Sequence, residues 1–307
     1  MLDFSSPCCF CPHHCHAMRQ QGETGFCGLD DQLYISSICR HRGEEPAISG
    51  ATGICNVFFA HCNLQCIYCQ NHQISDNRIH ADRFLISLHE VCDRITALLD
   101  TGISSVGFVS PSHQIPQMIQ IIETLHKRNY FPLIIYNTNS YDSVDTLIAI
   151  ENYVDVYLAD LKYYEDNLAF RFSGVHHYSG IARAAIREMI RQKGINLITN
   201  AAGLATKGVI VRHLVLPGHI DNTIAVLNAV ADELNPKITL SLMAQYYPSH
   251  KAGGIEGINR TLYPHEYERV LSYMEFLGIE NGWIQELESQ SNYLPDFTLD
   301  DPFEPEK

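Results

Sequence analysis

Three cysteines in one short segment have the clearest chemical meaning in this sequence. Cys62, Cys66 and Cys69 are separated by three and then by two residues, and Tyr68 stands directly before the last of them. Four thiolates close a tetrahedral zinc site or fully ligate an iron–sulfur cluster. Three thiolates instead leave one iron of a four-iron cluster open to another ligand, and an open position is typical of a catalytic metal site. The alternative is a zinc ion whose fourth ligand is Cys55 or a nearby histidine.

A second group of cysteines lies near the N-terminus and comprises Cys8, Cys11, Cys15 and Cys27. Four soft ligands are enough to close a tetrahedral zinc site or to hold a second iron–sulfur cluster, and both alternatives stay open. A thioredoxin-like redox pair is disfavoured because no βαβ pattern surrounds these residues. The other cysteines are interpreted as buried or spare thiols: Cys9, Cys39, Cys55 and Cys92.

The placement of the cysteines and the charge of the chain restrict its compartment and partners. All eleven cysteines of the 307 residues lie before Asp93, whereas a secreted disulfide scaffold spreads them through its fold. We see no secretory signal, and no apolar run approaches the roughly 20 residues of a membrane span. We therefore expect a cytoplasmic protein without a membrane partner. The formal net charge of −14 also disfavours a nucleic-acid partner.

Short apolar runs alternate with helical patterns from residue 54 onward. β-branched and aromatic residues predict strands over 54–60, 104–109, 132–137, 154–159, 208–216 and 237–243. Helical spacing of apolar residues predicts helices over 87–99, 116–128, 142–150, 180–193, 221–234 and 264–277. Because parallel strands need crossover connections, the pattern predicts an α/β fold with a parallel sheet covered by helices. An open doubly wound sheet and a partial or full barrel both satisfy it, and both place functional groups past the carboxyl ends of the strands.

Three regions are distinguished by composition. Residues 1–50 do not alternate in this way and are rich in Cys, Gly and His, which predicts a small appended metal module. Residues 51–288 carry the strand and helix pattern of the main domain. Residues 289–307 are acidic and punctuated by proline, which predicts a solvated C-terminal tail.

The three-cysteine motif, placed after the first strand of a βα repeat, resembles the hallmark of the radical SAM superfamily. The resemblance implies a partial (β/α)6 TIM-like barrel in which Cys62, Cys66 and Cys69 hold a [4Fe-4S] cluster. The open iron of that cluster would bind S-adenosylmethionine, with Tyr68 beside the cofactor. One-electron reduction would then cleave the cofactor to methionine and a 5'-deoxyadenosyl radical, which abstracts hydrogen from the substrate.

Longer stretches resemble proteins similar to pyruvate formate-lyase activating enzymes, over nearly the whole chain to about residue 286. They include HRGEEPAISG, FFAHCNLQCIYCQN, IIYNTNSYDS, VDVYLADLKY and VIVRHLVLPGH. Carried over by position, the resemblance implies that Asn137, Lys162 and Arg212 contact S-adenosylmethionine. Each residue also has an alternative interpretation. Asn137 could only form a turn, Lys162 could be a solvated loop cation, and Arg212 could be a buried structural partner of Asp160.

The sequence departs from the activating enzymes after the second predicted strand. Those enzymes carry a Gly-Gly-Glu stretch whose backbone receives the amino group of S-adenosylmethionine. Here the equivalent stretch is FVSPSHQIP, residues 108–116, in which Ser110, Ser112 or backbone carbonyls could take that role. The substitution is typical of a distinct subgroup, and it weakens the transfer of the activating function more than that of the chemistry.

Three functions follow as hypotheses. The first is a radical SAM enzyme that abstracts hydrogen from a glycine of a partner glycyl radical enzyme, with a flavodoxin- or ferredoxin-like electron donor. The second is a radical SAM enzyme that modifies a small molecule, a peptide or another protein residue. The third is a non-enzymatic zinc or iron–sulfur protein.

Overall fold

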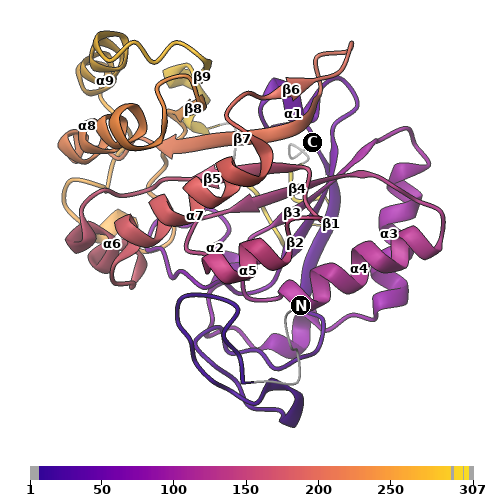
Figure 1. Ribbon diagram of the computed structural model, residues 1–307. Helices are drawn as coiled ribbons and strands as arrows, with labels where there is room; N and C mark the ends of the chain where they lie inside the picture. The colour runs from indigo at the N-terminus through magenta and orange to yellow at the C-terminus, as the bar shows by residue number, and fades with distance from the viewer. Residues whose placement is uncertain (1–6, 292–293, 300, 304–307) are drawn as a thin grey trace.

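The computed structural model describes residues 7–291, 294–299 and 301–303, and its centre is one mixed β-sheet (Figure 1). Nine strands of the described chain take part, in the order β1-β2-β3-β4-β5-β7-β8-β9, with β6 beside β7. They are β1 (Ile35–His41), β2 (Ile54–Phe59), β3 (Ser105–Val109), β4 (Leu133–Thr138), β5 (Val156–Asp160), β6 (Ile198–Thr199), β7 (Ala205–Leu214), β8 (Thr239–Met243) and β9 (Gly282–Ile284).

The seven strands from β2 to β9 on the main path pair in parallel, and β1 and β6 pair antiparallel with β2 and β7. Every residue of β2, β3, β5 and β8 is buried. Strands buried on both faces read as continuous apolar runs, which is why the sequence pattern located them. The prediction of a parallel sheet in an α/β fold is confirmed, with strand ends within about three residues of the expected positions.

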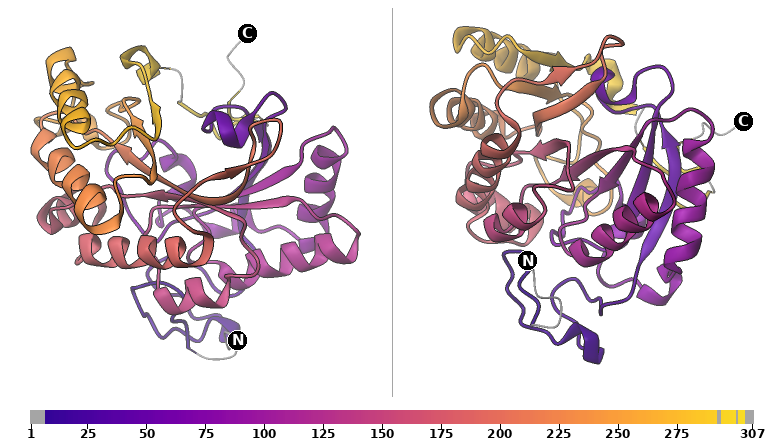
Figure 2. Two further views of the ribbon diagram at one scale, coloured as in Figure 1. Left: turned by 45° about the horizontal axis from the view of Figure 1, so that its top comes forward. Right: turned by 45° about the vertical axis from the view of Figure 1, so that its right-hand side comes forward.

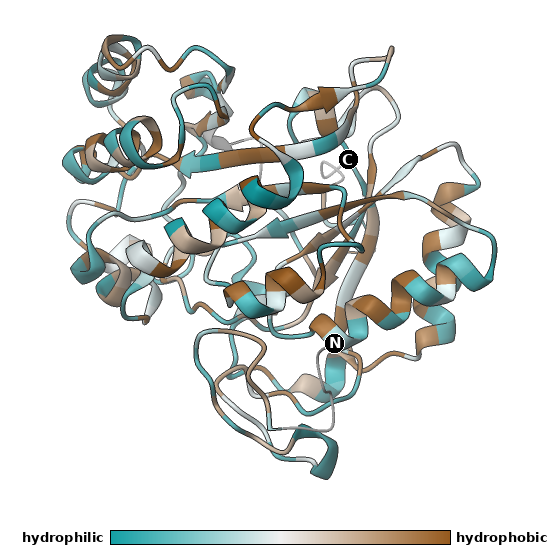
Figure 3. Cartoon of the chain, in the orientation of Figure 1, coloured by the Kyte–Doolittle hydropathy of each residue, from teal (hydrophilic) through white to brown (hydrophobic). Residues whose placement is uncertain are grey.

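Helices cover the outer face of the sheet, and the six predicted ones are present. They are α3 (Leu88–Leu99), α4 (Ile115–Lys127), α5 (Val144–Ala149), α7 (Tyr178–Lys193), α8 (Ile220–Ala229) and α9 (Pro264–Phe276). Hydrophobic and hydrophilic residues alternate along α4 and α7, as expected of helices with one face on a core (Figure 3). The helix predicted over 221–234 changes character at its end, because residues 230–234 form a π-helical turn.

Several shorter helices were not predicted. They are α1 (Pro46–Ser49), α2 (His72–Ser75) and α6 (Asp166–Ser173), together with 3-10 turns at Arg19–Gln21, Ala81–Phe84, Ala252–Gly254 and Leu287–Ser291. Such short elements bury few side chains and therefore carry little periodicity. The described part of the N-terminal segment runs as an indigo lobe at one end of the molecule, and α1 lies at the other end (Figures 1 and 2).

The sheet begins earlier than the boundary at residue 50 predicted from composition. β1 pairs with β2 from Ile35 to His41, so residues 35–41 belong to the sheet rather than to a separate cysteine-rich unit. Its sequence, ISSICRH, alternates poorly because it is an edge strand with a mixed burial pattern.

The C-terminal tail is also more closely packed than predicted in its described part. Phe297 and Phe303 pack against a cluster of buried residues that includes Phe58, with ring centroids 5.2 Å and 5.7 Å from the ring of Phe58. The side chain of Gln73 receives the N–H of Phe297 at 2.7 Å. Aromatic burial therefore overrides the acidic composition, while residues 300 and 304–307 lie outside the described part of the chain.

Candidate functional site

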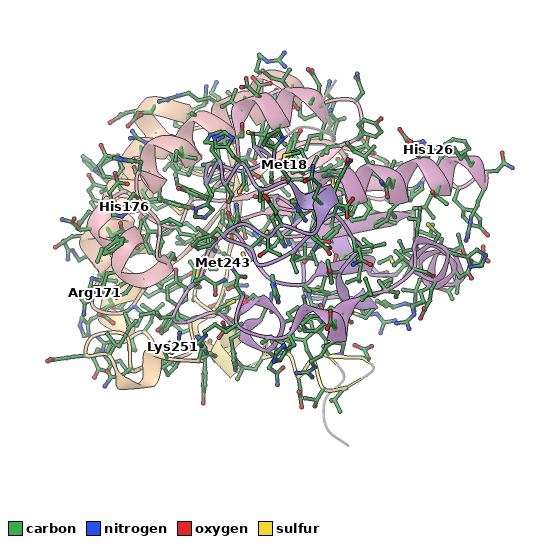
Figure 4. The ribbon with its side chains drawn as sticks, turned by 90° about the horizontal axis from the view of Figure 1, so that it is seen from below. Met18, His126, Arg171, His176, Met243 and Lys251 are labelled. Carbon is green, nitrogen blue, oxygen red and sulfur yellow. The ribbon has the colours of Figure 1, made fainter. Side chains whose placement is uncertain are left out.

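The candidate site is a cavity of about 670 Å³ that is lined by residues of the sheet and of the loops beside it. Each strand of the main path contributes to its lining, from His41 of β1 through Asp160 of β5 to Trp283 of β9. A sheet can enclose one cavity in this way only if it curves around it. Figure 4, seen from below, places the cavity residue Met243 near the centre of the molecule, with His126 and Lys251 toward its periphery.

The three predicted cysteine ligands, Cys62, Cys66 and Cys69, all line this cavity. They follow β2 in a loop whose backbone is held by specific contacts. The N–H of Leu64 points to the Cys62 sulfur at 3.4 Å, and the Cys66 sulfur lies 3.0 Å from the Ser173 hydroxyl. The loop therefore brings three thiols to one space at the carboxyl ends of the parallel strands.

Burial keeps these thiols protonated when no metal is bound. It raises the pKa of Cys62 to about 12 and that of Cys66 to about 11, and the charge of Lys162 partly opposes both rises. Burial raises the pKa of Cys69 as well. A bound cluster would displace these protons, because cysteine binds iron as the thiolate. Its iron ions would then balance the negative charges of the buried thiolates. Three thiols are the donor set that would hold a four-iron cluster with one iron left open to another ligand.

Tyr68 lies in the same wall and connects to the cysteine loop through buried hydroxyls. Its hydroxyl is 2.5 Å from that of Tyr163, which is 2.8 Å from the hydroxyl of Ser173. Ser173 in turn contacts Cys66. The aromatic of the motif is therefore the end of a hydrogen-bonded chain that reaches a cysteine sulfur.

Lys162, Arg212 and Asn137 line the cavity as part of one polar network. Lys162 Nζ lies 2.6 Å from one carboxylate oxygen of Asp160, and Arg212 Nε lies 2.9 Å from the other. Arg212 also donates to Asn137 Oδ1 at 2.9 Å and to Glu44 at 3.0 Å. The interpretation of Lys162 as a solvated loop cation is wrong, and so is that of Asn137 as a turn residue, since Asn137 lies within β4.

The pKa directions agree with this network. The charges of Lys162 and Arg212 hold the pKa of Asp160 below its usual value, against the effect of burial. The Asp160 carboxylate raises the pKa of Lys162 despite the burial of the amine. Both cations are therefore charged inside the cavity, where an anionic group of a ligand would meet them.

Of the serines in the loop after β3, only Ser110 lines the cavity. Its backbone is left-handed, with φ of 54°, and its N–H donates to the Asn137 carbonyl at 2.8 Å. Ser112 is fully buried and receives the Tyr136 hydroxyl at 3.3 Å, outside the cavity lining. The alternative of Ser112 as the contact for the amino group is wrong, because the turn at Ser110 directs the following residues into the core.

The four N-terminal cysteines lie outside the cavity lining, near enough to one another for their charges to interact. Burial raises the pKa of Cys27, and the charges of nearby Cys8 and Cys15 raise it further. The N–H of Phe26 points to the Cys15 sulfur at 3.2 Å, and Cys11 is buried. In the described part of the chain, no three or more His, Cys, Asp or Glu side chains are grouped closely enough to hold a metal ion.

Several residues of the site had no assigned role in the sequence analysis. His41, at the end of β1, and Glu44 and Glu45, just before α1, also line the cavity. They belong to the HRGEEPAISG stretch, where the paired carboxylates beside a proline were the available signal. Ser173 and Asn77 carried no signal, because each acts through a contact distant in sequence.

Comparisons with known proteins place the fold but leave the function open. No family model matches the chain. The uncharacterized protein MJ0674 of Methanocaldococcus jannaschii is 29% identical over 278 residues, which cover 89% of this chain and 75% of that protein.

The fold is similar to two solved structures at low identity. The FeFe-hydrogenase maturase HydG from Carboxydothermus hydrogenoformans matches with a TM-score of 0.50 and 14% identity, over 78% of this chain and 55% of that one. Native anSMEcpe with bound AdoMet matches with a TM-score of 0.50 and 14% identity, over 78% of this chain and 62% of that one. The chain thus spans less than two thirds of either protein, and the likeness concerns the α/β fold. No helix in the described residues is long and apolar enough to cross a membrane.

Proposed function

We propose that this chain is a radical SAM enzyme, cytoplasmic and built on a partial (β/α)6 barrel. The observation that carries the proposal is the shared cavity, in which Cys62, Cys66 and Cys69 face the buried Lys162–Asp160–Arg212 network. The fold likeness to anSMEcpe, whose structure holds AdoMet, supports the same cofactor here.

The cysteines would hold a [4Fe-4S] cluster, which when bound and reduced supplies the electron that cleaves S-adenosylmethionine to methionine and a 5'-deoxyadenosyl radical. The chain's own side chains bind and orient. Lys162 would offer its ammonium to the cofactor carboxylate, and Ser110, which lines the same cavity, would contact the cofactor amino group. Tyr68, which lines the cavity, would lie beside the cofactor, and the buried walls would exclude water from the radical.

Arg212 and Asn137 form part of the cavity wall, because their side chains are hydrogen-bonded to other residues of the chain. Three nitrogens of Arg212 are engaged by Asp160, Glu44 and Asn137, so its side chain is fixed within the cavity wall. A guanidinium held in this way keeps its charge and its position when a ligand enters. We propose that it contributes a fixed positive charge to cofactor binding.

The N-terminal cysteines Cys8, Cys11, Cys15 and Cys27 are proposed to hold a second iron–sulfur cluster or a zinc ion. Mutual charge effects on Cys11 from the other three support a common site. We further propose that a flavodoxin- or ferredoxin-like protein supplies the electron.

Two substrate classes remain as proposals. Resemblance to activating enzymes supports a glycine of a partner glycyl radical enzyme, whereas a cavity of about 670 Å³ lies in the range of small-molecule sites. A glycyl electron paramagnetic resonance signal on co-incubation with candidate partners would support the first. Turnover of a metabolite pool without a partner protein would support the second.

The experiment that tests the proposal is anaerobic reconstitution with iron and sulfide, followed by S-adenosylmethionine and dithionite. We expect about four irons bound at the motif and release of 5'-deoxyadenosine and methionine. A protein that binds no iron, or that binds iron but releases no 5'-deoxyadenosine, would contradict the proposal and favour a non-enzymatic metal protein.

A further inference from the structure

Glu45 lines the cavity from the segment that precedes β2, whereas the cysteine loop follows β2. Glu45 precedes α1, which lies at the end of the molecule away from the N-terminal lobe (Figure 1). Its side chain is 9% exposed, and its Oε2 has no hydrogen-bond partner in the described structure. Burying a carboxyl oxygen without a partner is costly, and native sites normally supply one.

The cations inside the cavity are already engaged by other carboxylates. Lys162 pairs with Asp160, and Arg212 pairs with both Asp160 and Glu44. Burial raises the pKa of Glu45 and the charge of Glu44 adds to the rise, whereas the charge of Arg212 and a hydrogen bond with Ser241 lower it. Arg212 is therefore shared among three carboxyl groups. Arg42 lines the cavity as well, but it is exposed to solvent. Glu45 is thus the carboxyl group for which the buried wall offers no cation of its own.

A second unpartnered polar atom lies in the same wall. His41, at the end of β1 and four residues before Glu45, is 8% exposed, and its Nδ1 makes no hydrogen bond in the described structure. The ring is fixed against Phe303, with centroids 4.1 Å apart. Burial lowers the pKa of His41, so its imidazole is neutral at physiological pH.

We infer that this wall binds the protonated amine of the substrate, with Glu45 as the carboxylate that receives it and His41 as a second polar contact. An alkylammonium brings the positive charge that Glu45 lacks and up to three N–H donors. A neutral hydroxyl could donate one hydrogen bond to Glu45 but brings no charge, and an anionic group would be repelled by the carboxylate. The inference rests on the proposed function, because it assigns the recognised end of that enzyme's substrate.

The test compares three probes of one size on the anaerobically reconstituted protein, without reductant or S-adenosylmethionine. Dissociation constants are measured by ligand-observed NMR for n-butylamine, 1-butanol and butyrate. We expect butylamine to bind at least about tenfold more tightly than the other two. The isosteric substitution Glu45→Gln should remove about tenfold or more of that affinity, while Glu275→Gln on the exposed face of α9 should leave it unchanged.

Equal affinity for the three probes, or unchanged butylamine binding in Glu45→Gln, would overturn the inference. Thermal unfolding gives an independent check. Relief of an uncompensated carboxyl predicts that Glu45→Gln unfolds at the same or a higher temperature, so a marked loss of stability would assign Glu45 a partner within the chain and also overturn it. A protein that binds the amine but releases no 5'-deoxyadenosine contradicts only the proposed function, and the reverse result contradicts only this inference.

Discussion

The side-chain amide of Asn77 pairs with the backbone of Cys62 in both directions. Asn77 Oδ1 accepts the Cys62 N–H at 3.0 Å, and Asn77 Nδ2 donates to the Cys62 carbonyl at 3.0 Å. The same Nδ2 donates to the carbonyl of Phe26 at 2.9 Å, next to Cys27 of the N-terminal group. One side chain therefore fixes the first cysteine of the motif and ties the N-terminal segment to it.

Replacing Asn77 by alanine should loosen both cysteine groups together. Three backbone groups lose their partners, and we expect the free energy of unfolding to fall by about 1–3 kcal/mol. The reconstituted protein should also lose iron faster on dilution into chelator. Asn281→Ala is the control, because it also removes two side-chain hydrogen bonds but lies away from the cysteine loop, and it should leave iron retention unchanged. Unchanged stability and iron retention in Asn77→Ala would show that the loop does not depend on this pairing.

The hydroxyl of Ser173 should tune the reduction potential of a bound cluster. It lies 3.0 Å from the Cys66 sulfur. Hydrogen bonds to cluster sulfurs stabilise the reduced cluster, which carries more negative charge, and so raise its reduction potential. Ser173→Ala should therefore shift the potential by about 20–60 mV to more negative values. A redox titration followed by electron paramagnetic resonance measures the shift, with Ser289→Ala as the control. A shift to more positive values would contradict the assignment.

Lys162 should contribute to the affinity for S-adenosylmethionine. Lys162→Met keeps the length of the side chain and removes its charge, while Asp160 retains Arg212 as a partner. We expect the dissociation constant to rise about tenfold, because a charge-assisted contact to the cofactor carboxylate is lost. Calorimetry on the reconstituted protein tests this, and Lys207→Met, which lies outside the cavity lining, serves as the control. Equal affinity in wild type and Lys162→Met would remove Lys162 from the cofactor site.

The two cysteine groups should be separable by mutation. Cys66→Ala should abolish cluster binding and the release of 5'-deoxyadenosine, because it removes one of three ligands. Cys11→Ala should spare a substantial part of that release, since Cys11 lies outside the cavity. Iron, sulfide and zinc analysis of both variants checks the expectation. Equal and complete loss in both would mean that the seven cysteines form one unit.

Two buried histidines should make the fold less stable in mild acid. Burial lowers the pKa of His213 to about 4 and that of His113 to about 3, below the value near 6.5 in an unfolded chain. The unfolded state therefore binds more protons below pH 6.5, so stability is full above that pH and falls as the pH drops toward 4. The slope should approach about 1.4 kcal/mol per pH unit for each histidine.

Urea unfolding between pH 7.5 and 4.5 measures this slope. His213 contacts the Leu161 carbonyl and the Thr223 hydroxyl, so His213→Gln retains a hydrogen-bonding side chain without titrating. This variant should show a shallower dependence on pH than the wild type. Identical slopes would mean that His213 is protonated in the folded chain.

Strands that are buried along their whole length could be predicted from the sequence. Edge strands, whose position depends on pairing with a strand far along the chain, could not. β2, β3, β5 and β8 are buried along their whole length, and their continuous apolar runs predict strands. β1 is half-buried and β9 has three residues, so neither shows a clear period. Their place at the two edges of the sheet depends on pairing with strands far along the chain.

The chemistry of the site divides in the same way. Spacing alone identified Cys62, Cys66 and Cys69 as a group, because three thiols within eight residues must share a loop. The sequence by itself also placed Asp160 and Lys162 at the carboxyl end of a predicted strand. Only the tertiary structure decided that Lys162 is paired, that Ser112 turns into the core and that Glu45 lines the same cavity as the cysteines. Burial and charge pairing depend on which segments meet, and a linear sequence carries no distance between residues so far apart.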